Sequence, residues 1–274
     1  MDVYDLITFP IYMGIIYFLA YWIRSKHRDN QLYQRYFIKG LNYKVIGALG
    51  FATIYWFYYK GGDSINFFYT TKPLHKLFFS NPSSFFSFVF SSNKTPYPDE
   101  CWYEAWTVYD VLWLARGSAS LTTIKIGAVL NLFACNSFIA ISLLMAFITY
   151  LFTWNAFELF VTLYPKLIKD FEIGFLMLPS ILFWGSGIGK DAIMFAAILN
   201  FVYCFYNLVI YKRNIFKNII SLIITVYLIS LIRSYILFTM GPSLILMTGI
   251  YYRNLFRNQA VRFLALPVFL AVVI

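Results

Sequence analysis

The chain has 274 residues, of which 61% are hydrophobic and 12% are charged. A soluble domain is nearer about half apolar and about a quarter charged, so this composition indicates a polytopic membrane protein. It excludes a disordered chain and a nucleic-acid-binding domain. Three widely spaced cysteines predict neither a disulfide framework nor a metal site. The net charge of +10 must then be interpreted by its location along the chain.

Apolar runs that suit membrane spans recur along the chain. The first run, residues 6–23, ends at a basic stretch, as spanning helices often do. The apolar stretch 121–163 is too long for one span, and Asn131, Asn136 and Ser137 interrupt it. We therefore expect a re-entrant or surface helix there, followed by a span at 138–160. The other predicted spans are residues 45–59, 173–189, 192–211, 219–232 and 236–252.

The last apolar run, residues 263–274, is too short to cross roughly 30 Å of hydrocarbon. We expect it to be either re-entrant or the first part of a truncated span. The predicted fold is thus all-α, a polytopic transmembrane helical bundle of about seven or eight spans. Residues 1–274 form a single membrane domain in this interpretation.

Residues 60–120 are mixed in character and predict a long outer loop. Prolines interrupt the loop, at Pro73, Pro82, Pro96 and Pro98. Phenylalanines interleaved with serines at residues 85–90 favour a segment that lies in the membrane interface. Tryptophans and a tyrosine at helical spacing within residues 100–114 predict a second interfacial helix.

Charge distribution sets the predicted orientation. With the amino terminus outside, most of the 22 Lys and Arg residues fall in inner loops. These inner residues are Arg24, Lys26, Arg28, Arg35, Lys39, Lys44, Lys166, Lys169, Lys212, Arg213, Lys217, Arg253, Arg257 and Arg262. The basic residues left outside are balanced by acidic ones, so the excess positive charge is cytoplasmic. We expect an integral protein of the plasma (inner) membrane that binds no nucleic acid.

Four ionisable residues stand out because they lie at the outer edge of the apolar layer: Asp63, Lys190, Asp191 and Arg233. A charge at membrane depth costs from about 2.5 kcal/mol upward, so it normally faces a wet cavity, a partner or a ligand. Gly61 and Gly62 precede Asp63 and allow the backbone to turn sharply. A purely structural interpretation is that they form a salt-bridge cluster that fixes helix ends, or extend to lipid headgroups. Taken together, the four favour a polar cavity at the outer face.

Residues 179–191, with the sequence PSILFWGSGIGKD, are the most informative segment. The three glycines before Lys190 suggest a phosphate-binding P-loop, but that motif needs Gly where Trp184 stands and Ser or Thr where Asp191 stands. We therefore reject nucleotide binding. Pro179 and the glycines are expected to break or tightly pack a helix near the outer face. Backbone N–H groups beside a lysine would suit a phosphate or pyrophosphate.

These features resemble the GT-C class of integral-membrane glycosyltransferases, which use lipid-linked sugar donors. That class places a catalytic acid in its first long outer loop, as Asp63 is placed here, and often carries a Pro-Ser segment similar to 179–191. The motifs Gly61-Gly62-Asp63, 133–138, 183–191 and 231–235 also resemble membrane proteins of Bacteroidetes surface-polysaccharide clusters. Where the class has paired carboxylates, this chain has Asp63 alone. Candidates for the second acid are Glu100, Glu104 and Asp110.

The resemblance implies transfer or polymerisation of a sugar on the outer face, from a polyprenyl-phosphate donor to a glycan or protein acceptor. Asp63 would be the general base. Lys190 and Arg233 would stabilise the departing lipid phosphate. Asp191 would orient Lys190 or bind a divalent metal, and membrane lipids would surround the donor's tail.

Two functions of other classes remain open at this point. One is a transporter or channel-like subunit, although no charge lies midway along a predicted span and no inverted repeat is evident. The other is a non-catalytic assembly factor in a membrane complex for secretion or polysaccharide export. The assembly factor predicts that Asp63, Lys190 and Arg233 can each be neutralised without loss of function.

Overall fold

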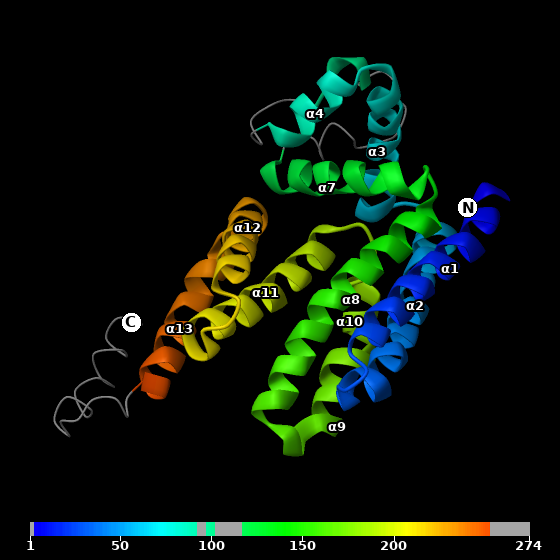
Figure 1. Ribbon diagram of the computed structural model, residues 1–274. Coiled ribbons are helices and arrows are strands. Elements are labelled where there is room, and N and C mark those ends of the chain that lie inside the picture. The colour runs from blue at the N-terminus through cyan, green and yellow to red at the C-terminus, as the bar shows by residue number, and fades with distance from the viewer. Residues whose placement is uncertain (1–2, 92–96, 102–116, 253–274) are drawn as a thin grey trace. The chain divides into compact units, whose positions relative to one another are not determined.

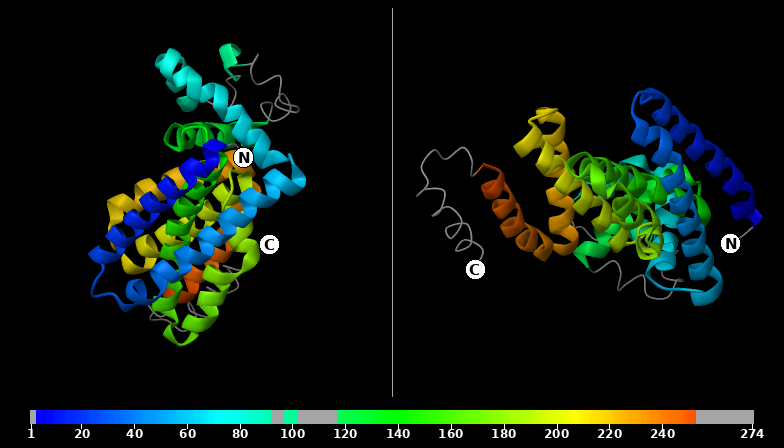
Figure 2. Two further views of the ribbon diagram at one scale, coloured as in Figure 1. Left: turned by 90° about the vertical axis from the view of Figure 1, so that its right-hand side faces the viewer. Right: turned by 90° about the horizontal axis from the view of Figure 1, so that it is seen from below.

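The computed structural model describes residues 3–91, 97–101 and 117–252, and this part of the chain is helical without a strand. The chain forms two compact units, residues 1–199 and 200–274. Figures 1 and 2 show the helices from three viewing directions. The expectation of a single membrane domain remains a prediction.

Four described helices are long and apolar enough to cross a membrane. They are Tyr4–Lys26, Phe138–Leu163, Lys190–Tyr211 and Ile215–Arg233. The described part of the chain is therefore all-helical, and its apolar helices are consistent with the membrane protein that the composition predicts. Pro10 lies inside the first of these helices, α1 (Val3–Lys26).

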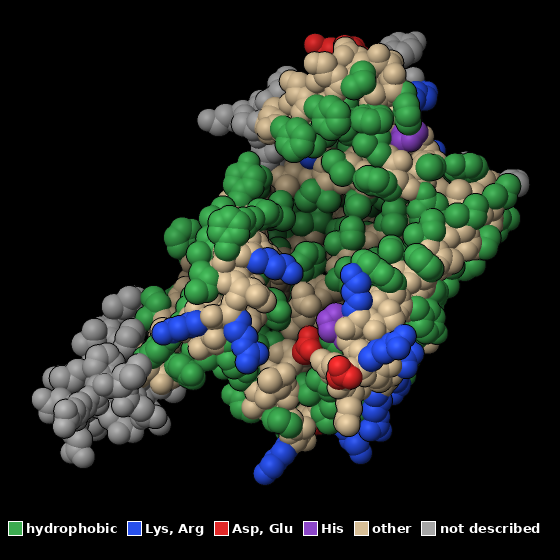
Figure 3. All heavy atoms as spheres, viewed as in Figure 1, with side chains coloured by type: hydrophobic (Ala, Val, Ile, Leu, Met, Phe, Trp, Pro, Cys, Tyr) green, Lys and Arg blue, Asp and Glu red, His purple; other side chains and the backbone are tan. Residues whose placement is uncertain are grey.

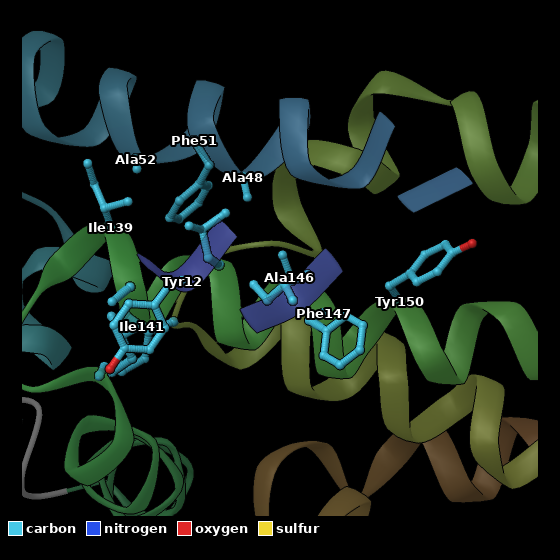
Figure 4. Packing of buried hydrophobic residues seen from close by; sticks show 14 of the residues in the cluster. Tyr12, Ala48, Phe51, Ala52, Ile139, Ile141, Ala146, Phe147 and Tyr150 are labelled. Carbon is cyan, nitrogen blue, oxygen red and sulfur yellow. The ribbon is translucent and has the colours of Figure 1, made fainter. Parts of the chain in front are cut away.

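The first unit is built around α8 (Phe138–Leu163). It packs against α1 and against α2 (Ile38–Thr53), which continues without a break into a π-helical segment, η2 (Ile54–Tyr59). Figure 4 shows Ala48, Phe51 and Ala52 of α2 pointing towards α8. Helix α2 also packs against α10 (Pro179–Trp184), and glycine permits this close approach, because a Cβ added at Gly47 would lie 2.6 Å from the carbonyl oxygen of Leu182.

The predicted division of residues 121–163 is confirmed. Helix α7 (Ser118–Ala134) ends before Cys135 and Asn136, which both adopt the left-handed conformation. Ser137 then caps α8 by accepting a hydrogen bond from the amide of Ala140 at 3.2 Å.

The segment expected to be a long loop is largely helical where it is described. It contains α3 (Asp63–Ser80) and α4 (Pro82–Phe90), which pack against each other and against α7. The Asn81 side chain caps α4, and Pro82 fits its first turn. Phe85 and Phe88 are buried, whereas Phe86 and Phe90 are exposed, so this segment has a core face and an exposed apolar face. Most of the second predicted interfacial helix, within residues 100–114, lies outside the described residues.

The predicted span 173–189 is divided in the structure. A 3₁₀ turn (η3, Pro165–Leu167), α9 (Ile168–Phe171) and a π-helical segment (η4, Glu172–Met177) lead to an extended residue, Leu178. Helix α10 (Pro179–Trp184) follows, and α11 (Lys190–Tyr206) begins after five non-helical residues.

The second unit contains the end of α11, η5 (Asn207–Tyr211), α12 (Ile215–Arg233) and α13 (Tyr235–Tyr252). Its interior holds a small polar cluster in which the Asn200 amide donates to Ser221 at 2.9 Å and to Thr225 at 2.6 Å. Such contacts join helices where no water is available. The predicted segment 263–274 lies outside the described residues.

Candidate functional site

Asp63 is the first residue of α3, directly after a sharp turn. Lys60 ends η2 in the left-handed conformation, and Gly62 has a φ of 95° that side chains rarely adopt. A Cβ added at Gly62 would also lie 3.3 Å from Cε1 of Tyr55. The glycines therefore have the turning role that the sequence predicts. The exposed Asp63 carboxylate lies at a helix N-terminus, where the helix dipole favours negative charge.

Two hydroxyl groups lie beside this turn. Ser64 is buried and shares a hydrogen bond with the phenol of Tyr55, which projects from η2. Gly189 approaches from another part of the chain, because a Cβ added there would lie 3.8 Å from the Ser64 oxygen. The start of α3 and the residue before α11 are thus neighbours.

Lys190 and Asp191 open α11 at this place. The Lys190 ammonium lies 5.8 Å from the ring centroid of Phe67, which is one turn beyond Asp63 in α3. Both Asp63 and Asp191 interact electrostatically with the Tyr55 hydroxyl. Three of the four predicted site residues therefore meet around Tyr55 and Ser64.

The glycine-rich segment 185–189 forms a buried, non-helical turn between α10 and α11. A Cβ added at Gly187 would lie 1.8 Å from the Phe51 ring, so only glycine fits there. The carbonyl of Gly185 accepts a hydrogen bond from Thr149 of α8 at 2.7 Å. The predicted helix break is confirmed, and its backbone is buried within protein, as irregular backbone in a membrane must be.

Lys44 corrects one sequence-based assignment. We expected it in an inner loop, but it lies in α2, and its side chain is 2% exposed. Its ammonium donates to the carbonyl of Ile181 at 3.3 Å and contacts Gly185, at the end of α10. Helix α2 begins earlier than the apolar pattern indicates. Lys44 supports the break as a second donor to the Ile181 carbonyl, which also accepts from the Gly185 amide at 3.1 Å.

The remaining predicted residues do not join this group within the first unit. Arg233 is the half-buried last residue of α12, in the second unit. Glu100 is exposed, in a short segment whose Tyr97 donates to the carbonyl of Thr70 in α3 at 2.7 Å. Glu104 and Asp110 lie outside the described residues. The described part of the chain holds no cluster of three or more His, Cys, Asp or Glu that could bind a metal ion.

The arrangement brings together two helix N-termini, those of α3 and α11, and with them a lysine and two aspartates. Helix N-termini and an ammonium favour an anion, and an exposed carboxylate can accept a proton from a hydroxyl. Tyr55 and Ser64 were not predicted as site residues. The position of Ser64 next to Asp63 was a signal, whereas Tyr55 reaches the site only because the Gly61-Gly62 turn folds α3 back towards it.

Apolar side chains cover much of the surface, and Lys and Arg side chains gather at one end of the first unit's helices (Figure 3). Among the described residues of this unit, Lys39 binds Glu172 at 2.5 Å, and the Glu158 carboxylate accepts from Asn30 at 2.8 Å.

Comparisons with protein-family models, curated proteins and solved structures found no match to this chain.

Proposed function

We propose that the chain is an integral-membrane glycosyltransferase that moves a sugar from a polyprenyl-phosphate donor to an acceptor hydroxyl at the outer membrane face. The observation that carries this proposal is the approach of Asp63, at the start of α3, to Lys190 and Asp191, at the start of α11. The transfer needs a base for the acceptor's proton and a cation for the departing phosphate. Asp63 and Lys190 supply these two groups.

In the proposed step the acceptor oxygen attacks the anomeric carbon of the donor sugar. Its proton goes to the Asp63 carboxylate as the new glycosidic bond forms. The bond between the anomeric carbon and the phosphate oxygen breaks, and its electron pair stays on the phosphate. The Lys190 ammonium stabilises the charge that grows there, and Asp191 holds Lys190 in position. Polyprenyl phosphate and the glycosylated acceptor, a glycan or a protein, leave.

We assign Arg233 as a second cation for the donor phosphate and assign seven or eight spans to the bundle. The continuous helix α2–η2, the segment η4–α10 and α13 add to the four long apolar helices. The amino terminus and Asp63 lie outside the cytoplasm, and the basic end of the first unit lies inside, because Lys and Arg gather on the cytoplasmic side of membrane proteins. The membrane is the plasma (inner) membrane.

Release of polyprenyl phosphate tests the proposal. The full chain in lipid nanodiscs is given a series of polyprenyl-phosphate sugars with glycan and peptide acceptors, and the freed lipid phosphate is measured by chromatography. At least one donor should be consumed, and Lys190→Met should weaken binding of polyprenyl phosphate itself at least tenfold. Lys166→Met, which changes an exposed lysine outside the site, is the matched control. If no donor is consumed and wild-type protein does not bind polyprenyl phosphate, the proposal fails.

One observation favours a second candidate, an anion transporter subunit. Lys44 is a buried cation beside a broken helix, and transporters bind anions at such breaks. This candidate predicts anion flux into proteoliposomes that Lys44→Met removes, with no consumption of any lipid-linked sugar. The transferase predicts consumption of the sugar without flux.

A further inference from the structure

The junction between α7 and α8 has an unusual backbone held by side-chain amides. Cys135 and Asn136 have positive φ angles of 50° and 61°, which non-glycine residues rarely adopt in succession. Asn131 holds this turn twice. Its side-chain Oδ1 accepts from the Asn136 backbone N–H at 3.1 Å, and its Nδ2 donates to the side-chain Oδ1 of Asn136 at 2.7 Å.

These bonds fix which way the Asn136 amide points. Its oxygen is engaged by Asn131, so its nitrogen faces the other side, where Nδ1 of His75 lies 3.1 Å away. An amide nitrogen can only donate. Nδ1 of His75 must therefore accept, which requires a neutral ring that carries its proton on Nε2.

We propose that His75 is a proton-sensitive lock that joins α3 to the turn between α7 and α8. When the imidazole gains a second proton, Nδ1 becomes a donor that opposes the donor of Asn136. The hydrogen bond is then lost, and Asn136 cannot turn its amide without losing its bond to Asn131. The junction opens at low pH and closes near neutral pH.

The surroundings of His75 set the pH range. The side chain is half-buried, and this burial lowers its pKa from the ordinary value of 6.5. Groups that can carry charge on the elements that form the junction are Lys72 and Lys76 of α3, Lys125 of α7, Asp5 and Tyr12 of α1, and Cys135 of the turn. Asp5 accepts a hydrogen bond from Ser137. A folded pKa below the unfolded one gives stability above pH 6.5, which is lost as pH falls through the lowered pKa.

The lock bears on the candidate site because α3 connects the two. Asp63 begins the helix that carries His75, and α3 packs on α7. Tyr12 of α1 also donates to the Phe133 carbonyl at the end of α7, so the opening involves three helices. This inference does not depend on the proposed transferase activity.

Nitrogen NMR of the imidazole rings tests the proposal directly, because the chain has two histidines. Nδ1 of His27 lies 3.0 Å from the carbonyl of Ile23, so His27 should carry its proton on Nδ1. The His27→Gln variant leaves His75 alone in the spectrum. At pH 7.5 we expect His75 to be protonated on Nε2 only, with a midpoint below 6.5. A proton on Nδ1 at pH 7.5, or a midpoint at or above 6.5, would overturn the proposal.

Hydrogen exchange in nanodiscs tests the consequence. After correction for intrinsic rates, the turn at 134–138 and the end of α3 should exchange at least threefold faster at pH 5 than at pH 7.5. The His75→Gln variant keeps a neutral acceptor and should lose this difference, whereas His27→Gln should keep it. An equal pH response in His75→Gln and wild type would contradict the lock. If His75→Gln does not fold, the NMR titration of His27→Gln still determines whether the proposal holds, because that variant retains His75.

Discussion

The Lys190 ammonium lies 5.8 Å from the ring centroid of Phe67, one turn beyond Asp63 in α3. The two helices that carry these residues begin at the same place, although more than 120 residues separate Asp63 from Lys190 in the chain. A turn of two glycines places one helix start, and a buried glycine-rich turn places the other. The candidate site is therefore a product of close backbone packing.

Gly187→Ala tests that packing. The added Cβ would lie 1.8 Å from the Phe51 ring, so the turn or α2 must move, at a cost of about 1–3 kcal/mol or more. We expect a clearly lower Tm in detergent. Gly14→Ala is the control, because a Cβ there meets no heavy atom within 4 Å and alanine favours a helix. Equal Tm values for the two variants would contradict the observed packing.

Asp5 and Ser137 should be energetically coupled. The Ser137 hydroxyl donates to the Asp5 carboxylate at 2.6 Å and also accepts from the Ala140 amide as the cap of α8. Ser137→Ala should cost about 1–2 kcal/mol from the lost cap, and Asp5→Asn should cost less once Ser137 is absent. A double-mutant cycle on unfolding in mixed micelles measures the coupling. Strict additivity would show that the two residues act separately.

Lys44→Met should keep or raise stability. The change removes a buried cation that has one hydrogen bond to a carbonyl, and methionine has a similar length. Replacing a buried charge by an apolar side chain is often neutral or stabilising. Thermal unfolding of wild type and Lys44→Met measures the change in stability. Lys39→Met is the comparison, because it removes an exposed salt bridge worth about 0–1 kcal/mol. A loss of more than about 3 kcal/mol would give Lys44 a larger structural role than its one bond indicates.

Stability should depend on pH through His75. Because the folded pKa is below 6.5, wild-type protein should lose stability as pH falls below 6.5, and His75→Gln should lose less over the same range. Tm measured from pH 7.5 to 5.0 checks this sign. A wild-type Tm that rises towards pH 5, relative to His75→Gln, would contradict it.

Local chemistry in the sequence predicted several features correctly. Asn136 and Ser137 marked the boundary between α7 and α8, because an asparagine tolerates the left-handed conformation and a serine caps a helix. Pro179 and the glycines of 185–189 marked the break between α10 and α11. Asp63, Lys190 and Asp191 were chosen because charges at the edge of an apolar layer need a partner, and the structure places them at neighbouring helix starts. Their roles stay a prediction.

Features that depend on tertiary packing were not predictable in this way. The phenylalanines and prolines of residues 63–90 suggested a loop, but Phe67, Phe68 and Phe85 are buried where α3, α4 and α7 meet. Lys44 was assigned to a loop because a charge ended the apolar run, whereas a neighbouring carbonyl accommodates it inside. The role of Tyr55 depends on the turn at Gly61 and Gly62, whose three-dimensional course the periodicity of apolar residues does not encode.

The measurement that tests the central claim most directly separates donor binding from turnover in Asp63→Asn. If Asp63 is the general base, the variant should bind polyprenyl phosphate within about twofold of wild type and lose turnover by roughly 10²–10⁴-fold. Asp99→Asn, which changes an exposed acid outside the candidate site, should retain both. Unchanged turnover in Asp63→Asn, with wild-type protein active, would remove Asp63 from the chemistry and contradict the account.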